Sequence, residues 1–178
     1  MKKIALALMF ALPLAGCGSN PAGIKSGDAV SQPKGPAPEF ELEKVAGGQL
    51  KADEIKGKVT IVDFWATWCQ PCIAEIPNFN KIHEKWADKG VQMLGITVES
   101  GSLEDIRPKV DELGLKYPVV VGNDKVVEGF GGLIGFPTTF IVSKDWKIYK
   151  KYLGMTPHKR ELIEKDIEKL LAEEANLN

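Results

Sequence analysis

The chain has 178 residues, 44% of them hydrophobic, and its 23 basic and 24 acidic side chains give a formal net charge of −1. This length supplies the core of one domain of ordinary size and leaves too little for two. The balanced charge excludes the basic surface that nucleic acids require, so we expect no nucleic-acid partner.

The N-terminal residues have the layout of a secretory signal. Two lysines precede an apolar run at residues 4–14, which is too short to span a membrane. The run ends in Leu-Ala-Gly-Cys17, which resembles the bacterial lipobox, whose cysteine receives a diacylglycerol thioether and becomes the first mature residue. We therefore expect a lipoprotein signal peptide at residues 1–16 and a lipidated Cys17. The alternative is a plain cleaved signal peptide with an incidental cysteine.

A segment rich in Gly, Pro and Ser follows Cys17. Residues 18–38 offer almost nothing apolar to bury, which is typical of a flexible tether. We expect residues 17–38 to link a membrane anchor to one folded domain at residues 39–178. This arrangement predicts a lipid-anchored protein of the cell envelope that faces the periplasm or the cell exterior.

Strands and helices alternate through the rest of the chain. A short hairpin around Gly47-Gly48 is expected first, because alternating residues flank a turn signal. The predicted strands and helices then follow in the order strand 59–66, helix 70–87, strand 91–98, helix 103–113, strand 117–121, helical turn 125–130 and the strand hairpin 138–143 with 147–152. The last helix is expected to begin with Thr156 as N-cap and Pro157 in its first turn. This order predicts an α/β sandwich around a mixed sheet.

If Cys17 carries lipid, Cys69 and Cys72 are the remaining thiols. A bridge across so small a loop stabilises a domain little, so a purely structural disulfide is not expected. A zinc site would need more ligands, and the chain offers only His83 and His158 and no second cysteine pair. The pair is therefore interpreted as redox-active, and no metal or cofactor is expected.

The two cysteines are predicted to differ in role because of their place at the start of a helix. Cys69 lies where the strand ends, so its sulfur faces the free N–H groups and positive end of the helix dipole, which favour a thiolate. Cys72 lies one turn later and further from solvent. Pro71 costs little in a first turn. We expect Cys69 to attack a substrate disulfide and Cys72 to resolve the mixed disulfide.

The stretches "VDFWATWCQPC" and "GFPTTFIV" resemble the thioredoxin superfamily, and its exported TlpA/ResA-like branch in particular. The resemblance implies a thioredoxin-like three-layer α/β/α sandwich with a mixed central sheet, an N-terminal β-hairpin and a central helix–strand insertion at residues 103–121. It also implies a cis Pro137 beside the cysteines, with the Phe136 backbone pairing with extended substrate. Trp65 and Trp68 are expected as aromatic cover around the site.

Three acidic residues are candidates for the same site. Asp63 matches the buried aspartate of thioredoxins, and Glu75 matches a glutamate of the TlpA/ResA-like branch; both are expected to serve proton transfer. The alternatives are a strand-end residue turned to solvent for Asp63 and a solvated helix face for Glu75. Glu99 is similar to an acid that lines the substrate cavity in some relatives.

These features predict a membrane-tethered thiol–disulfide oxidoreductase that reduces protein disulfides. The resemblance implies apocytochrome c as one substrate, an upstream membrane thiol reductase as electron donor, and a monomer. The alternatives on the same fold are a copper metallochaperone and a thiol peroxidase. The first needs a wider cysteine spacing and a histidine, and the second a Pro-x-x-x-Thr-x-x-Cys motif that this chain lacks.

Overall fold

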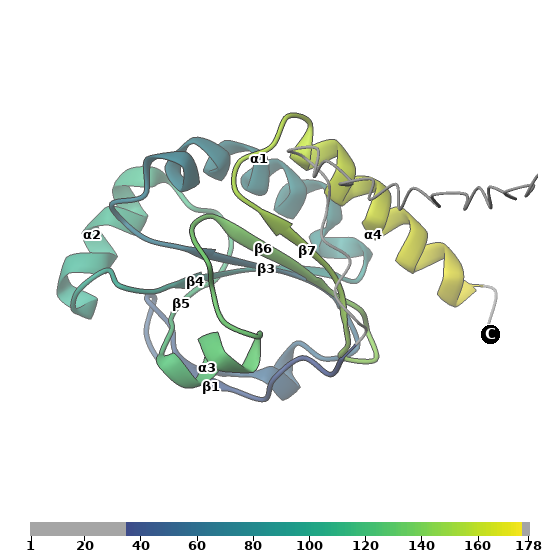
Figure 1. Ribbon diagram of the computed structural model, residues 1–178, viewed down its shortest axis with the longest axis horizontal. Helices are drawn as coiled ribbons and strands as arrows, with labels where there is room; N and C mark the ends of the chain where they lie inside the picture. Colours follow the sequence, from purple (N-terminus) through teal and green to yellow (C-terminus); the bar gives the residue numbers. More distant parts are fainter. Residues whose placement is uncertain (1–34, 176–178) are drawn as a thin grey trace, which may run out of the picture.

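A computed structural model describes residues 35–175 and shows the expected three layers, with helices on both faces of a central sheet (Figure 1). The expected signal peptide, Cys17 and most of the tether lie outside the described residues. Within those residues, no helix is both long enough and apolar enough to cross a bilayer.

The central sheet has five strands in the order β5-β4-β3-β6-β7. The parallel strands are β3 (Val59–Trp65), β4 (Val91–Thr97) and β5 (Val119–Val121), and the antiparallel strands are β6 (Thr138–Val142) and β7 (Ile148–Leu153). All seven residues of β3 are buried, as its β-branched and aromatic sequence predicts for a central strand. The expected mixed sheet is thereby confirmed.

Two helices cover one face of the sheet. They are α1 (Gln70–Trp86) and α4 (Lys159–Ala175), which lie side by side in Figure 1. Their apolar side chains pack on β3 and β4 in one core cluster that includes Ile61, Phe79, Ile82, Ile163 and Ile167. Short 3₁₀ helices, Ala52–Glu54 and Ala87–Lys89, follow β2 and α1.

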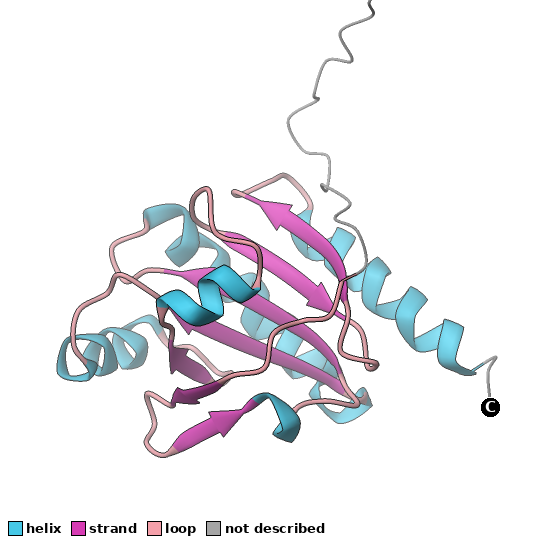
Figure 2. Cartoon of the chain, turned by 60° about the horizontal axis from the view of Figure 1, so that its bottom comes forward, coloured by secondary structure: helices cyan, strands magenta, loops and turns pink. Residues whose placement is uncertain are grey.

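The opposite face is covered by α3 (Asp124–Gly129) and the hairpin of β1 (Glu41–Glu43) and β2 (Gln49–Lys51), which Figure 2 brings to the front. The core on this side includes Leu42, Leu50, Phe64, Val126 and Phe130. Helix α2 (Leu103–Leu113) lies at the β5 side of the sheet, where Ile106 packs with Trp65 and Val119. The predicted hairpin and helix–strand insertion are confirmed.

The last helix begins later than predicted. Thr156 and Pro157 lie before α4, which starts at Lys159, so the expected N-cap is wrong. His158 has a left-handed backbone with φ of 58°, which interrupts the helical conformation there. Its carbonyl oxygen accepts the bond from the Leu162 amide that opens the helix.

The fold also begins earlier than the expected boundary at residue 39. Pro36 bridges to Lys147, and the amide of the buried Ala37 donates to the carbonyl of Trp146 over 2.9 Å. Residues 35–38 are therefore packed on the domain and do not belong to a tether.

Candidate active site

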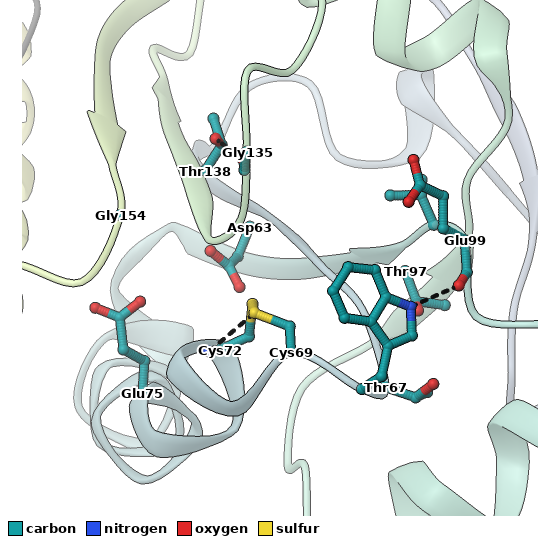
Figure 3. The surroundings of a disulfide bond; sticks show 12 residues. Asp63, Thr67, Cys69, Cys72, Glu75, Thr97, Glu99, Gly135, Thr138 and Gly154 are labelled. Atoms are coloured by element: carbon teal, nitrogen blue, oxygen red, sulfur yellow. Dashed lines mark hydrogen bonds between the residues drawn. A yellow bond between two sulfur atoms is a disulfide. The ribbon is translucent and has the colours of Figure 1, made fainter.

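Cys69 and Cys72 form a disulfide at the junction of β3 and α1, with their Cα atoms 5.3 Å apart (Figure 3). Cys69 is the N-cap residue of α1, and Cys72 lies in its first turn with Pro71 between them. Both are buried, with 5% of Cys69 and 1% of Cys72 exposed. Cys69 is therefore the more accessible of the two residues.

The first turn of α1 places a donor on the Cys69 sulfur. The Cys72 amide N–H donates to Sγ of Cys69 over 3.2 Å. A free N–H and the positive end of a helix dipole stabilise negative charge at this position. In the reduced protein the same geometry favours a thiolate on Cys69.

Asp63 lies on β3 with only 2% of its surface exposed, so the alternative of a carboxylate turned to solvent is wrong. The Thr139 hydroxyl donates to its Oδ1 over 2.7 Å. Burial raises the pKa of Asp63 to about 7, while the charge of Lys159 and the Thr139 hydrogen bond act to lower this pKa and Glu75 to raise it. A carboxyl group in this range exchanges protons near neutral pH.

Glu75 is also buried, with 4% exposed, so the alternative of a solvated helix face is wrong. Its Oε2 accepts a hydrogen bond from the Lys159 ammonium over 2.8 Å. Burial raises the pKa of Glu75, and the Lys159 charge and hydrogen bond oppose this effect. In the view of Figure 3, Asp63 and Glu75 lie on the same side of the disulfide, with Glu99 on the other.

Sequence reasoning missed Lys159 and Thr139, the partners of the two acids. One signal was available for the lysine: a cation at the start of a helix opposes the helix dipole, so its presence there requires another interaction. Thr139 lies in the predicted strand after Pro137, but only the sheet register shows that it faces Asp63.

The opposite side of the site is formed by Trp68 and the segment before β6. The peptide bond from Phe136 to Pro137 is cis, as the resemblance implied. Trp68 is 56% exposed, and its ring meets the Phe136 ring edge-on, with 5.8 Å between their centroids. An aromatic pair, with Trp68 exposed and Phe136 half-buried, therefore lies next to the cysteines. Trp65, in contrast, is buried and packs in the same core cluster as Cys69 and Cys72.

Glu99 contacts the site through its backbone. Its carbonyl oxygen accepts a 2.8 Å hydrogen bond from the Trp68 indole N–H. The residue is exposed and has a left-handed backbone with φ of 52°. Ser100, which sequence reasoning missed, fixes this loop because its Oγ accepts from the amide of Thr67 over 3.0 Å and donates to the carbonyl of Val98. The loop thereby orients Trp68.

Within the described part of the chain, no three His, Cys, Asp or Glu side chains are grouped so as to hold a metal ion. His83 is half-buried and packs edge-on against Tyr117. The copper metallochaperone alternative therefore gains no set of ligands from these residues.

Comparisons with known proteins agree with this geometry. The model of the AhpC/TSA family matches residues 33–151. The thiol-disulfide oxidoreductase ResA of Bacillus thuringiensis is 30% identical over 118 residues, which cover 66% of this chain and 68% of ResA.

Two solved structures have the same fold. A thiol:disulfide interchange protein of the thioredoxin family from Chlorobium tepidum is 28% identical, with a TM-score of 0.69, covering 79% of this chain and 98% of its own. The pneumococcal exposed lipoprotein thioredoxin of Streptococcus pneumoniae is 27% identical, with a TM-score of 0.66. The match covers 75% of this chain and 100% of the pneumococcal one.

Proposed function

The chain belongs to the AhpC/TSA family as a thioredoxin-like thiol–disulfide oxidoreductase, and from this premise we propose that it reduces disulfides of exported proteins. The observation that carries the proposal is the Cys69–Cys72 disulfide at the start of α1, beside the buried carboxylate of Asp63. The neutral Gln-Pro pair between the cysteines supports a reducing role, because no histidine there stabilises the thiolate.

The reaction begins with the Cys69 thiolate, which the helix start stabilises. It attacks one sulfur of the substrate disulfide, and the other sulfur leaves with the electron pair and takes a proton. The thiol of Cys72 then loses its proton to Asp63 and attacks Sγ of Cys69. The Cys69–Cys72 bond forms, and the second substrate thiol departs.

Substrate binding is assigned to the surface that surrounds Cys69. The exposed Trp68 ring and the Phe136 ring offer an apolar contact, and the backbone at Phe136, before the cis Pro137, offers edge pairing to an extended segment. The Glu99 carbonyl holds Trp68 in place. Apocytochrome c with an oxidised cysteine pair is one substrate that this surface would bind.

The cellular setting of the proposal rests on the leader and on one relative. Cys17 follows a lipobox-like sequence, and the pneumococcal relative is named an exposed lipoprotein thioredoxin. We assign to this chain a lipid anchor on Cys17 and a place on the outer side of a membrane. It acts as a monomer, and an upstream membrane thiol reductase reduces its disulfide again after each cycle.

The test is a disulfide-reduction assay combined with substrate trapping. Wild-type protein should reduce insulin with dithiothreitol as donor, and a redox titration should give roughly −200 to −300 mV. Cys72→Ala should accumulate mixed disulfides through Cys69, and Cys69→Ala should form none. A potential near that of the strong oxidant DsbA, about −120 mV, would contradict a reductase. Rapid turnover of hydrogen peroxide would instead favour the peroxidase alternative.

A further inference from the structure

Lys159 is a buried cation at the first position of α4. Only 4% of its surface is exposed, and its ammonium donates to Oε2 of Glu75 over 2.8 Å and to the carbonyl of Gly154 over 3.1 Å. The ammonium also lies 5.6 Å from the ring centroid of Phe79. Groups from α1 and from the loop after β7 therefore hold the lysine in one place.

Stability does not explain this pair. Taking two charges out of water costs several kcal/mol per ion in order of magnitude, and an apolar pair in the same space is often as stable. A cation at the start of a helix also opposes the helix dipole. A role in the chemistry therefore explains the buried Glu75–Lys159 pair, one turn along α1 from Cys72, better than stability does.

The charge of Lys159 acts on Asp63 as well as on Glu75. Burial is the largest effect on Asp63 and raises its pKa, and Lys159 is the largest effect that lowers it. Glu75 acts on Asp63 in the opposite sense and more weakly. The lysine thus offsets part of the burial cost of two carboxylates at once.

We propose that Lys159 is a positioning residue for proton transfer at the dithiol: it keeps Glu75 ionised and keeps Asp63 able to accept the Cys72 proton near neutral pH. The inference rests on the proposed function. In the step concerned, Cys72 gives its proton to Asp63, the Cys69–Cys72 bond forms, and the bond between Cys69 and substrate breaks. The departing substrate thiolate carries away the electron pair, so the two protein thiols are oxidised and one disulfide is reduced.

Other titratable groups face the same region. Tyr117 precedes β5, and burial raises its pKa well above the ordinary value, so it stays neutral. Three more, His158, Arg160 and Glu161, line a pocket of about 490 Å³ whose wall includes Glu75 and Lys159. The pair is thus part of the wall of this pocket. His158 must be tested separately because its imidazole lines the same pocket as Lys159.

The experiment follows the resolving step in reduced protein mixed with excess dithiobis(nitrobenzoate). Attack by Cys69 releases one thionitrobenzoate in a concentration-dependent phase, and attack by Cys72 releases the second in a concentration-independent phase. We measure the second phase from about pH 5 to pH 10 for wild type, Lys159→Met and Lys159→Arg. Lys150→Met is a matched control, because Lys150 of β7 also pairs with α4, at Asp166 over 2.9 Å. His158→Asn tests the imidazole.

For Lys159→Met we expect the pH profile to move to higher pH, with a rate about tenfold lower near pH 7 that recovers near pH 9. Lys159→Arg should stay within about twofold of wild type at each pH, since it keeps the charge. The two control variants should keep the wild-type profile. If the rate falls equally at all pH values, or the profile does not move, Lys159 has a structural role only and the proposal is overturned.

A variant that removes both charges covers the case in which Lys159→Met does not fold. Glu75→Gln with Lys159→Met removes both charges of the ion pair, so neither partner is left charged and unpaired. Lys159 acts on Asp63 more strongly than Glu75 does. The pH profile of the double variant should therefore still lie at higher pH than that of wild type. A wild-type profile in this folded variant would overturn the proposal. Failure of the wild-type protein to release the second thionitrobenzoate would contradict the proposed function instead.

Discussion

The hydroxyl of Thr139 donates a 2.7 Å hydrogen bond to the carboxylate of Asp63 across the antiparallel pairing of β6 and β3. The two residues are direct partners in the sheet register, and both are buried. Thr139 follows the cis Pro137 by two residues. The strand that begins directly after the cis proline therefore carries a hydrogen-bond donor for the buried acid.

Replacing Thr139 with valine keeps the shape and removes this donor. The bond lowers the pKa of Asp63, so its loss should raise that pKa further and move the resolving step to higher pH. A bond to a charged acceptor contributes about 1.5–3 kcal/mol, and the free energy of unfolding at pH 8 should fall by about that amount. Stopped-flow kinetics and urea unfolding of Thr139→Val test both effects.

Thr60→Val is the matched control, since Thr60 is buried on β3 and its hydroxyl makes only a 3.4 Å contact to the Lys58 carbonyl. Its effect on stability should not depend on pH. A pH profile of Thr139→Val that coincides with that of wild type would show that the hydroxyl does not act on Asp63.

Asp63→Asn should stabilise the oxidised protein at neutral and alkaline pH. Burial raises the folded-state pKa of Asp63 to about 7, from an ordinary value of 3.8. The folded state therefore holds a proton that the unfolded chain loses, and stability falls as pH rises from about 4 to about 7. Asparagine can still accept the Thr139 bond and has no charge to bury. We expect a gain of about 1–4 kcal/mol at pH 8 and little gain near pH 4.

Urea unfolding of both proteins at the two pH values measures this difference. Asp88→Asn, at an exposed position, should show no gain at either pH. An equal gain for Asp63→Asn at both values would mean that Asp63 is not protonated in the folded protein at low pH.

The parts of the fold and site that follow local chemistry could be predicted from the sequence. The β-branched run before the cysteines predicts the buried strand β3, because such residues fill both faces of a central strand. Cys69 lies at the helix start because a strand ends just before it and Pro71 suits a first turn. The cis Pro137 came from family resemblance and not from a local pattern.

The partners of the two acids could not be predicted in this way. Lys159 lies 84 residues from Glu75, and Thr139 lies 76 residues from Asp63. Each pairing depends on how α4 packs on α1, or on the register of β6 against β3, which no local pattern specifies. The predicted start of α4 is wrong for a similar reason, because positive φ is uncommon even at histidine and no local pattern specifies it at His158.

The two cysteines of the reduced protein should react at different rates with iodoacetamide. Sγ of Cys69 accepts a hydrogen bond from the Cys72 amide N–H at the start of α1, and Cys69 is the more exposed of the two. Its thiolate should therefore form below the ordinary pKa of about 8.5 and be alkylated at least about tenfold faster than Cys72 near pH 7. Peptide mass mapping of quenched samples measures both rates. Faster labelling of Cys72 would reverse the assigned roles.

Trp68 should contribute to the binding of protein substrates and not to the chemistry of the cysteines. Its exposed ring meets Phe136 edge-on, and its indole N–H donates to the Glu99 carbonyl over 2.8 Å. Trp68→Ala removes both contacts and should raise KM for a protein disulfide about tenfold, because an aromatic anchor contributes roughly 1–2 kcal/mol or more at an interface. The rate with a small disulfide such as hydroxyethyl disulfide should stay within about twofold, since such a substrate needs no apolar docking surface. Trp68→Phe keeps an aromatic ring and loses the indole N–H, so its KM should lie between those of wild type and Trp68→Ala.

Glu99→Gln separates the two possible roles of Glu99, because it changes the carboxylate and keeps the carbonyl oxygen that holds Trp68. We expect wild-type kinetics for Glu99→Gln; a raised KM would mean that the Glu99 carboxylate itself contacts the substrate. A loss of activity on the small disulfide in Trp68→Ala would show that the indole acts on the cysteines rather than on docking.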